Sequence, residues 1–418
     1  MLKELFPRAH RRFSSLPLLG SIADGFTGWL QQQGYRRGCV RHYVRELVRI
    51  DTMIQLRGRN SLHDISREDL AACRPANSQD NRNLSGTISA LVRYLEAHIL
   101  LPPPCLDPLS SRDAVLADYK HFLVHVRGLS RSTITGHLGT VSCFLGHLGY
   151  ESDPSQLVEL KACDIETFIT HLGKRHCRGT LQHEAAQLRS FLRFSAAMGM
   201  LRPGLDANID TPRLYRLEQL PRALPWENIC ALLTSIDRST PMGLRDHAML
   251  FLIATYGLRA CDIRSLRLED IHWRQGKIQV TQRKTRQPLV LPLTDAAGDV
   301  LVQYLRNGRP QAPFRQIFLR ERAPIGPFKS TGVHDAFTGC VKRSGLKFPF
   351  TGIHCLRHSY ALHLLRQGTP LKTIGDLLGH RTAESTCVYL RLDIEDLREV
   401  ALSVPGDCTS PQNLEVPQ

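Results

Sequence analysis

Two stretches near the C-terminus, HCLRHSYALHLLRQG (residues 354–368) and IGDLLGHRTAESTCVYLRL (residues 374–392), carry apolar residues at three- and four-residue spacing. That spacing predicts amphipathic helices. In the first stretch, His354 and Arg357 are three residues apart at the start of a helix, so their side chains share one face. In the second, His380 falls at a helix end and Tyr389 follows nine residues later. These four side chains are candidates for one shared site.

The preceding segment adds two basic residues next to predicted turns. TYGLRACDI (residues 255–263) places Arg259 at a glycine-containing helix junction. GKIQVTQRKTRQPLVLPL (residues 276–293) predicts a β-hairpin whose polar turn contains Lys284. Apolar spacing predicts further helices at residues 294–306, 330–345, 354–367, 370–379 and 382–390. From Pro225 onward we therefore expect a mainly α-helical domain with a small β-sheet.

Two proline-rich breaks, at residues 101–111 and 202–225, divide the chain. They predict an additional helical module in 1–100, a helical domain in 112–200, a third domain in 222–403 and a flexible tail in 404–418. The first two parts share helical spacing and basic residues, which fits either duplication or convergence between amphipathic helices. The arginine-rich first fifteen residues fit either a basic arm or a solvated terminus.

The formal net charge of the 418 residues is +15, which favours a polyanionic partner. Nucleic acid, an anionic membrane surface and a ribosomal contact all fit that charge alone. No apolar run is long enough to cross a bilayer and no signal-peptide core is present, so we expect a cytoplasmic protein without a membrane partner. The 12 cysteines include no CxxC pair, and we expect reduced, mostly buried thiols that hold no metal.

Together these motifs resemble the signature of the tyrosine recombinase (phage integrase) family. The resemblance rests on YGLRACDIRSLRLEDI (residues 256–271) and on the two C-terminal stretches, and it covers about residues 222–400. Residues 112–200 resemble, more weakly, the family's core-binding helical domain. The residues at the family's signature positions are Arg259, Lys284, His354, Arg357, His380 and Tyr389.

The resemblance implies that DNA strands are cut and rejoined through a 3′-phosphotyrosine on Tyr389. A free phenol with a pKa near ~10 is almost wholly protonated at neutral pH, and the family assigns the required help to His354. His380 would donate a hydrogen bond to the phosphate. Asp262 stands where many family members carry Glu, and it would support Arg259. Because the phosphotyrosine conserves the energy of the broken linkage, we expect no ATP, metal or other cofactor.

The resemblance also assigns the cationic groups. Arg259 and Arg357 would clamp the nonbridging phosphate oxygens, since guanidinium groups suit bidentate contacts to phosphate. Lys284 would protonate the leaving 5′ oxygen. Its neighbours Lys277 and Arg286 remain alternatives for that role, because the register of a hairpin is hard to derive from sequence.

The partner expected from the resemblance is double-stranded DNA, held in a clamp between the helical N-terminal domains and the catalytic domain. Arg131 and Arg189 are candidate contacts to backbone phosphates. Strand exchange needs two duplexes, which implies a homotetramer, and residues 393–402 would form a helix that packs on a neighbouring subunit. Residues 1–100 would bind a second DNA site, hold subunits together or recognise a partner recombinase.

For the biological role we favour a bacterial, nucleoid-associated integrase or transposase of a mobile element, with a resolvase of chromosome or plasmid dimers as the alternative. Other classes are a type IB topoisomerase, a catalytically silent DNA-binding regulator and a metal-dependent transposase. A metal-dependent transposase would need clustered carboxylates, and the acidic residues of this chain are not spaced to form such a cluster. Three further phenols are expected to have structural roles, at Tyr256, Tyr304 and Tyr360.

Overall fold

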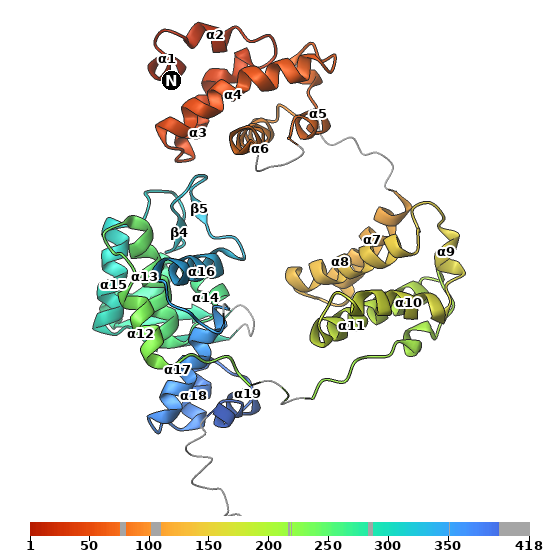
Figure 1. Cartoon of the computed structure of the whole chain (residues 1–418), viewed down its shortest axis with the longest axis vertical. Coiled ribbons are helices and arrows are strands. Elements are labelled where there is room, and N and C mark those ends of the chain that lie inside the picture. The colour runs from red at the N-terminus through yellow and green to blue at the C-terminus, as the bar shows by residue number, and fades with distance from the viewer. Residues whose placement is uncertain are drawn as a thin grey trace, which may run out of the picture. The chain divides into compact units, whose positions relative to one another are not determined.

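The computed structural model describes residues 1–75, 81–101, 110–215, 218, 220–282, 287–350 and 352–392. The described residues of Met1–Leu101 and Gln219–Gln418 form one compact unit, and those of Pro102–Glu218 form another. Helices dominate throughout, accompanied by small antiparallel sheets near the C-terminus (Figure 1). The expected fold class, mainly α with a small sheet in the C-terminal domain, is confirmed.

Residues 1–101 form a helical module with its own hydrophobic core. Its helices are α1 (Leu2–Leu5), α2 (His10–Ser14), α3 (Ala23–Gln32), α4 (Arg37–Gln55), α5 (Arg67–Ala72) and α6 (Arg82–Ala97). Apolar residues of α4 recur every three or four positions, and Val40, Val44 and Leu47 are fully buried. This periodicity packs α4 against α3 and α6.

The first fifteen residues belong to this module, so the expectation of a free arm or a solvated terminus was wrong. Leu2, Leu5, Phe6 and Phe13 are buried. The carboxylate of Asp24 also accepts a hydrogen bond from the backbone N–H of Leu2 at 2.7 Å. The apolar residues between the arginines explain the difference, because α1 and α2 bury them against α3 and α4.

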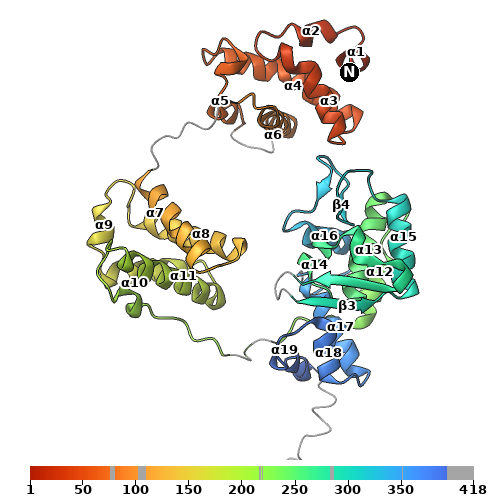
Figure 2. The ribbon, with the colours of Figure 1, turned by 180° about the vertical axis from the view of Figure 1, so that it is seen from behind.

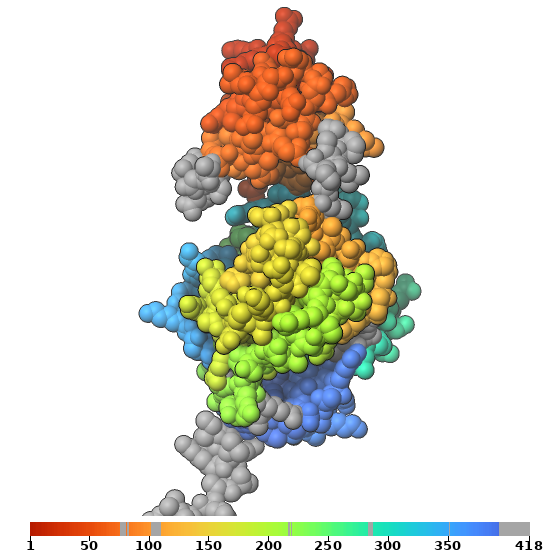
Figure 3. Space-filling view, turned by 90° about the vertical axis from the view of Figure 1, so that its right-hand side faces the viewer, coloured from red at the N-terminus to blue at the C-terminus, as the bar shows by residue number. Residues whose placement is uncertain are grey.

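The second unit is a helical domain whose described part has a separate core. Its helices are α7 (Ser111–His121), α8 (Arg131–His147), α9 (Ser155–Val158), α10 (Ala162–Gly173) and α11 (Arg178–Ala197), with a π-helical turn at Phe122–Val126. In the space-filling view they pack into one continuous body, coloured orange through yellow to yellow-green (Figure 3). The buried Tyr119 hydroxyl lies 2.8 Å from Nδ1 of His137 and donates to Ser190 at 3.0 Å, which ties α7 to α8 and α11.

The C-terminal domain is built around α13, which packs against α15, α16 and α17. Its helices are α12 (Trp226–Thr234), α13 (Pro241–Tyr256), α14 (Ala260–Ser265), α15 (Asp295–Asn307), α16 (Gly332–Ser344), α17 (His354–Arg366), α18 (Leu371–Leu378) and α19 (Glu384–Cys387). Most side chains of α13 are buried, as its long apolar run requires. A smaller core joins α17 and α18 to the segment around Tyr389.

The predicted hairpin consists of β2 (Lys277–Thr281) and β3 (Pro288–Pro292), which pair antiparallel with Ile278 opposite Leu291 (Figure 2). The short strand β1 (Ile271–His272) extends it to three strands, and β4 (Leu319–Arg320) pairs with β5 (Gly326–Pro327) in a second sheet. Neither addition was predicted, because two-residue strands carry no alternation to recognise. The turn with Lys284 and the predicted helix at 393–402 lie outside the described residues.

Two further expectations, on membrane spans and on cysteines, can be compared with the structure. No helix in the described part of the chain is long and apolar enough to cross a membrane. The expectation of mostly buried thiols was wrong, because five of the described cysteines are exposed and three are buried. Cysteine is small enough for the solvent face of a helix, and isolated positions in a sequence do not show which face they occupy. The exposed ones are Cys143, Cys163, Cys177, Cys230 and Cys387.

Candidate active site

A sharp turn between α13 and α14 presents Arg259. Gly257 ends α13 in the left-handed conformation (φ +60°), and Arg259 is the extended residue that precedes α14. A Cβ atom on Gly257 would lie 2.5 Å from a methyl carbon of Leu378 and 2.7 Å from the ring of Tyr360. Glycine is therefore required here both for its backbone conformation and for close packing. The sequence correctly placed Arg259 at a glycine-containing helix junction.

Arg357 lies on the first turn of α17 and is only 5% exposed. Its Nη1 donates to the carbonyl of Gly257 at 2.5 Å, and its Nη2 donates to the carbonyl of Leu378 at 2.7 Å. Arg357 thus satisfies the C-terminal carbonyls of two helices, α13 and α18. Burial, with the nearby charge of Arg259, lowers the pKa of Arg357 to about 10, so the guanidinium is still protonated at neutral pH.

Gln282 connects the sheet to this cluster, and the sequence did not suggest it. Its Oε1 accepts a hydrogen bond from Nη1 of Arg259 at 3.0 Å, and its Nε2 donates to the carbonyl of Leu378 at 3.1 Å. Gln282 is 1% exposed and directly follows β2. Its amide oxygen thereby helps to orient Arg259. A glutamine at a strand end carries no signal that would have identified it.

Tyr389 lies between α19 and the terminal turn Leu390–Leu392, with only 2% of its surface exposed. Its hydroxyl is 3.2 Å from Nδ1 of His358, a residue that the sequence analysis missed. Burial raises the pKa of Tyr389, whereas the charges of Arg357 and Arg259 act to lower it. The position of His358, one turn after His354, could have indicated this contact.

His380 follows Gly379, which ends α18 in the left-handed conformation. Its Nδ1 lies 2.8 Å from the hydroxyl of Thr386, and its ring is nearly parallel to that of Tyr389, with centroids 6.4 Å apart. Burial, followed by the charges of Arg357 and Arg259, lowers the pKa of His380 to about 4. The imidazole is therefore neutral at physiological pH.

Three residues predicted for the site remain to be placed, namely His354, Asp262 and Lys284. His354 begins α17 and is exposed, with its ring centroid 6.5 Å from that of His358. Asp262 is buried on the first turn of α14, and its negative charge favours the protonated form of Arg357. Lys284 lies outside the described residues.

The other phenols in this domain have structural partners, as expected. The hydroxyl of Tyr256 accepts a hydrogen bond from the backbone N–H of Thr294 at 3.2 Å. The hydroxyl of Tyr304 accepts one from Leu319 at 3.3 Å within the core. Tyr360 packs beside Gly257. Tyr389 instead lies beside the rings of His358 and His380.

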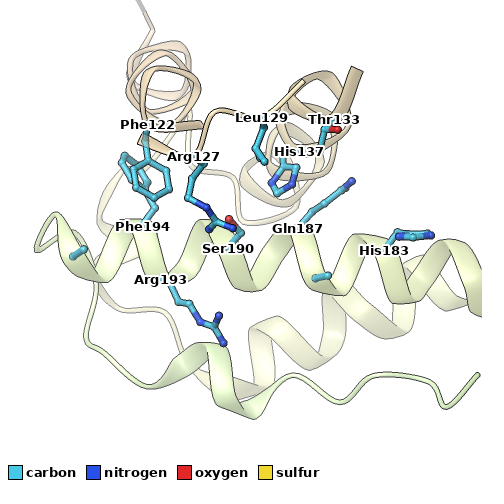
Figure 4. Close-up of a pocket in the computed structure, with 12 residues that line it drawn as sticks. Phe122, Arg127, Leu129, Thr133, His137, His183, Gln187, Ser190, Arg193 and Phe194 are labelled. Carbon is cyan, nitrogen blue, oxygen red and sulfur yellow. The ribbon is translucent and has the colours of Figure 1, made fainter. Parts of the chain in front are cut away.

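A hollow between α8 and α11 in the second unit collects polar side chains (Figure 4). Arg127 extends toward Ser190 there, and His137 and His183 line the same surface. Of the two arginines expected to contact DNA in this unit, Arg131 is exposed at the start of α8. Arg189 instead donates to the carbonyl of Ile209 at 2.7 Å and to the hydroxyl of Thr211, so it fastens the following segment to α11.

The described residues contain no group of three or more His, Cys, Asp or Glu side chains arranged to hold a metal ion. The chemistry that the cluster itself offers is cationic. It presents two guanidinium groups and three imidazoles around one phenol, which suits an anionic, phosphate-sized group.

Comparison with known proteins agrees with this geometry. Residues 222–395 match the family model described as the phage integrase family. The chain is 32% identical over 389 residues to a putative integrase/recombinase, y4rA, of Sinorhizobium fredii (strain NBRC 101917 / NGR234), covering 91% of this chain and 93% of that protein. It is also 32% identical over 292 residues to the tyrosine recombinase XerD of Listeria monocytogenes serotype 4b (strain F2365), covering 68% of this chain and 96% of XerD.

Solved structures share the fold. The XerH site-specific recombinase bound to palindromic difH in a post-cleavage complex matches with a TM-score of 0.54 and 16% identity, over 81% of this chain and 93% of that one. A lambda integrase tetramer bound to a Holliday junction matches with a TM-score of 0.51 and 19% identity, over 71% of this chain and 86% of that one. The chain belongs to the phage integrase family of tyrosine recombinases and catalyses site-specific DNA recombination by strand cleavage and religation.

Proposed function

We propose that Tyr389 is the nucleophile and that Arg259, Arg357, His354, His358 and His380 serve the phosphoryl transfer around it. The observation that carries this proposal is the 3.2 Å contact between the Tyr389 hydroxyl and Nδ1 of His358, which directly follows Arg357 on α17. A phenolate is stabilised by adjacent cations, so positive charge from Arg259 and Arg357 would favour the deprotonated, reactive form of Tyr389.

In the proposed cleavage step, the Tyr389 oxygen attacks the scissile phosphorus and the bond from phosphorus to the 5′ oxygen breaks. The products are a 3′-phosphotyrosine and a free 5′-hydroxyl. The phenolic proton passes to a histidine, and the leaving oxygen takes a proton from a general acid, for which Lys284 is our candidate. Religation reverses both proton transfers, so the cycle consumes no ATP and we propose that it needs no metal.

The phosphate would sit between the two guanidinium groups. Arg357 is held by two carbonyls and Arg259 by Gln282, so neither cation has to reorganise when the phosphate arrives. Preorganised donors of this kind stabilise the charge that develops on the nonbridging oxygens. The neutral His380 imidazole would add a hydrogen bond, and Thr386 sets the orientation of its ring.

Two histidines compete for the phenolic proton. His354 is exposed and is the position assigned by the family resemblance, whereas His358 contacts the Tyr389 hydroxyl at 3.2 Å. Burial, together with the charges of His354 and Arg357, lowers the pKa of His358 to about 4, so its ring is neutral at physiological pH. We propose that His358 positions the phenol by accepting its hydrogen bond and that His354 acts once the phosphate is bound.

The burial of Tyr389 implies a movement before attack. With 2% of its surface exposed, the residue cannot meet a DNA phosphate unless the segment that carries it shifts. That segment consists of the four-residue helix α19 and a short turn, and it belongs to a small core of four fully buried apolar residues. Few contacts have to be broken, so DNA binding could supply the necessary free energy.

On DNA, we propose that the second unit contacts backbone phosphates through its exposed basic residues. Arg131 and the hollow that contains Arg127 and His183 are the candidate contacts. Arg189, which we expected among them, contributes through the segment it fastens. We also propose a homotetramer, since recombination joins two duplexes and the lambda integrase structure of the same fold is a tetramer on a Holliday junction.

For the biological role, we propose integration or excision of a mobile element, with a possible partner recombinase. The match to the putative integrase/recombinase extends over 91% of the chain, whereas the match to XerD leaves about a third of the chain without a counterpart. A recombination assay in bacteria separates the roles. Excision from a plasmid carrying element ends supports this proposal, and resolution of plasmid dimers alone supports a resolvase.

The chemical proposal is tested with a nicked suicide duplex, from which the cleaved fragment diffuses away and traps the covalent complex. A protein–DNA adduct that survives denaturing electrophoresis, in the presence of a chelator, is the expected result. An adduct that requires divalent metal would indicate a carboxylate-based enzyme. DNA binding without an adduct would indicate a silent regulator, and relaxation of supercoils without pairing of sites would indicate a topoisomerase.

A further inference from the structure

Helix α4 of the N-terminal module carries a row of arginines at four-residue intervals: Arg37, Arg41, Arg45 and Arg49. All four are exposed, opposite the apolar residues that α4 buries in the core. Residues four apart lie one above the other on a helix, with a rise of about 6 Å per step. The row therefore extends about 18 Å along the helix axis and turns by about 120° around it.

Helix α2 adds another arginine beside this row. Arg12 lies on α2, which packs against α4, and it lines one shallow hollow together with Arg45 and Arg49. The same hollow is bordered by Val48, Thr52, Met53 and one acidic residue, Glu46. Arg8 and Arg11 are exposed in the same N-terminal segment. We call the surface formed by Arg12, Arg41, Arg45 and Arg49 the α4 basic face.

One acidic residue, Glu46, lines the hollow with three arginines, so the hollow keeps a net positive charge. Among the described residues, Asp69 pairs with Arg59 at 2.9 Å and Glu96 with Arg67 at 3.1 Å. The Asp51 carboxylate accepts the backbone N–H groups of Leu18 and Leu19. In the described part of the chain, the arginines of the α4 basic face make no ion pair.

Like charges at four-residue spacing destabilise a helix, so an unpaired row of them is unfavourable unless an anion is bound. The face is held rigidly, because α4 is anchored by fully buried residues along its length and Arg41 packs over the ring of Phe6 at 5.4 Å. A rigid row of guanidinium groups suits a repeating anion better than a single one.

We infer that the α4 basic face binds the phosphate backbone of double-stranded DNA, as a contact separate from those of the second unit and of the Tyr389 cluster. A duplex presents one negative charge for about every 1.7 Å of its axis, so several phosphates fall within the length of the row. The exposed large apolar residues of the described module are Met1, Leu56 and Ile99, and none of them lines the hollow, so the face lacks the apolar anchor that membrane binding uses.

The contact is independent of sequence and sensitive to salt, because it consists of guanidinium and phosphate groups alone. Each phosphate that a cation neutralises contributes about 0.9 to the slope of log affinity against log salt concentration. The three arginines around the hollow then contribute about 3 to the slope of the whole protein. The inference does not depend on the role proposed for Tyr389.

The test uses the full-length protein and a duplex of arbitrary sequence. The variant Arg12→Gln/Arg45→Gln/Arg49→Gln removes three charges from the hollow. Its matched control, Arg57→Gln/Arg67→Gln/Arg74→Gln, removes three charges from exposed arginines elsewhere on the module. Between 50 and 200 mM salt, wild-type affinity is expected to fall about 40-fold more than that of the hollow variant. The control is expected to follow the wild type closely.

A single substitution, Arg12→Glu on the short helix α2, provides a second variant should the triple variant fold poorly, as monitored by circular dichroism. It is expected to lower the salt slope by about 1. The inference would be overturned if both variants showed the same slope of log affinity against log salt concentration as the control. If the variants lost affinity only for single-stranded RNA, or only for vesicles containing phosphatidylserine, the face would be assigned to that partner instead. Adduct formation on the suicide duplex at low salt should be unchanged, which separates this result from a failure of the catalytic proposal.

Discussion

Nδ1 of His358 lies 3.2 Å from the hydroxyl oxygen of Tyr389. His358 is held on α17 directly after Arg357, so one helix turn carries both a cation for the phosphate and a hydrogen-bond partner for the phenol. His354 precedes them by one turn on the same helix. The motif HCLRH therefore supplies three of the proposed catalytic groups, and its last residue contacts the proposed nucleophile, Tyr389.

Replacing His358 with alanine should slow strand cleavage about 10²-fold, because the phenol loses the group that orients it. The pH dependence of the rate should stay as in the wild type, because His354 remains to take the phenolic proton. The cleavage rate of the suicide duplex, measured against pH at saturating protein, gives both quantities. His363→Ala is the control, because His363 lies on the same helix but stacks on Trp226, with ring centroids 4.1 Å apart. A cleavage rate equal to that of the control would leave His358 with a packing role only, and a rate restored by higher pH would show that His358 itself takes the proton.

Replacing Arg259 with lysine should slow cleavage about 10²- to 10³-fold, although the positive charge is retained. Lysine cannot donate to Gln282 and hold a phosphate in the same fork-like geometry. Affinity for DNA should change little, since many other contacts hold the duplex. Arg267→Lys, at an exposed position that pairs with Glu269, is the matched control. Equal cleavage rates in the two variants would exclude a bidentate role for Arg259.

Arg357→Ala should lower the free energy of unfolding by about 2–5 kcal/mol, in addition to slowing cleavage. The side chain donates to the carbonyls of Gly257 and Leu378, and its removal takes the Arg357 donor from Gly257 and leaves Leu378 with Gln282 alone. Denaturant titration of the purified protein measures the loss. Arg366→Ala, exposed near the end of the same helix, should cost little. If the two variants were equally stable, Arg357 would not connect α13 to α18.

Gly379→Ala should destabilise the site by about 2–4 kcal/mol, since the residue combines a left-handed backbone with overpacking. Its φ is +63°, and an added Cβ would lie 2.1 Å from Nε2 of Gln282. Displacing Gln282 would also misplace Arg259, so cleavage should slow together with the loss of stability. Gly345→Ala is the control, because φ there is +72° but the surroundings of its Cβ are open. A similar effect at both glycines would mean that only backbone strain matters.

Acidification should destabilise the C-terminal domain between about pH 6.5 and pH 4. Burial lowers the pKa of His358 and that of His380 to about 4, from 6.5 in the unfolded chain. In this range the unfolded chain binds more protons than the folded one, so the free energy of unfolding falls as the pH falls. Denaturant titrations across the range test this, and His380→Gln should flatten the dependence. If the free energy of unfolding of His380→Gln fell with pH as steeply as that of the wild type, His380 would not titrate in this way.

Local sequence patterns accounted for the helices and for most of the cluster. Apolar periodicity and the glycine after Tyr256 were sufficient to predict α15, α17, α18 and the junction at Arg259, because those features are encoded within a few residues. The hairpin followed from its alternation around a polar turn. These features depend on local chemistry, which a single sequence displays.

Contacts between distant segments were not predictable in the same way. Gln282 approaches Arg259 only because the end of β2 meets the end of α18, and no local pattern encodes that meeting. Arg189 looked like a DNA contact because its charge is visible in the sequence, whereas the carbonyl of Ile209 that it binds is not. The burial of Phe6 and Phe13, which made the basic N-terminus part of a folded module, likewise depends on tertiary packing.

The identity of the nucleophile is tested most directly by digesting the covalent complex formed on a nicked suicide duplex and identifying the peptide that carries the nucleotide by mass spectrometry. A nucleotide 3′-phosphate attached to the peptide that contains Tyr389, with no adduct in Tyr389→Phe, is the predicted result. A nucleotide on any other residue, or an adduct that persists at wild-type level in Tyr389→Phe, would contradict the account.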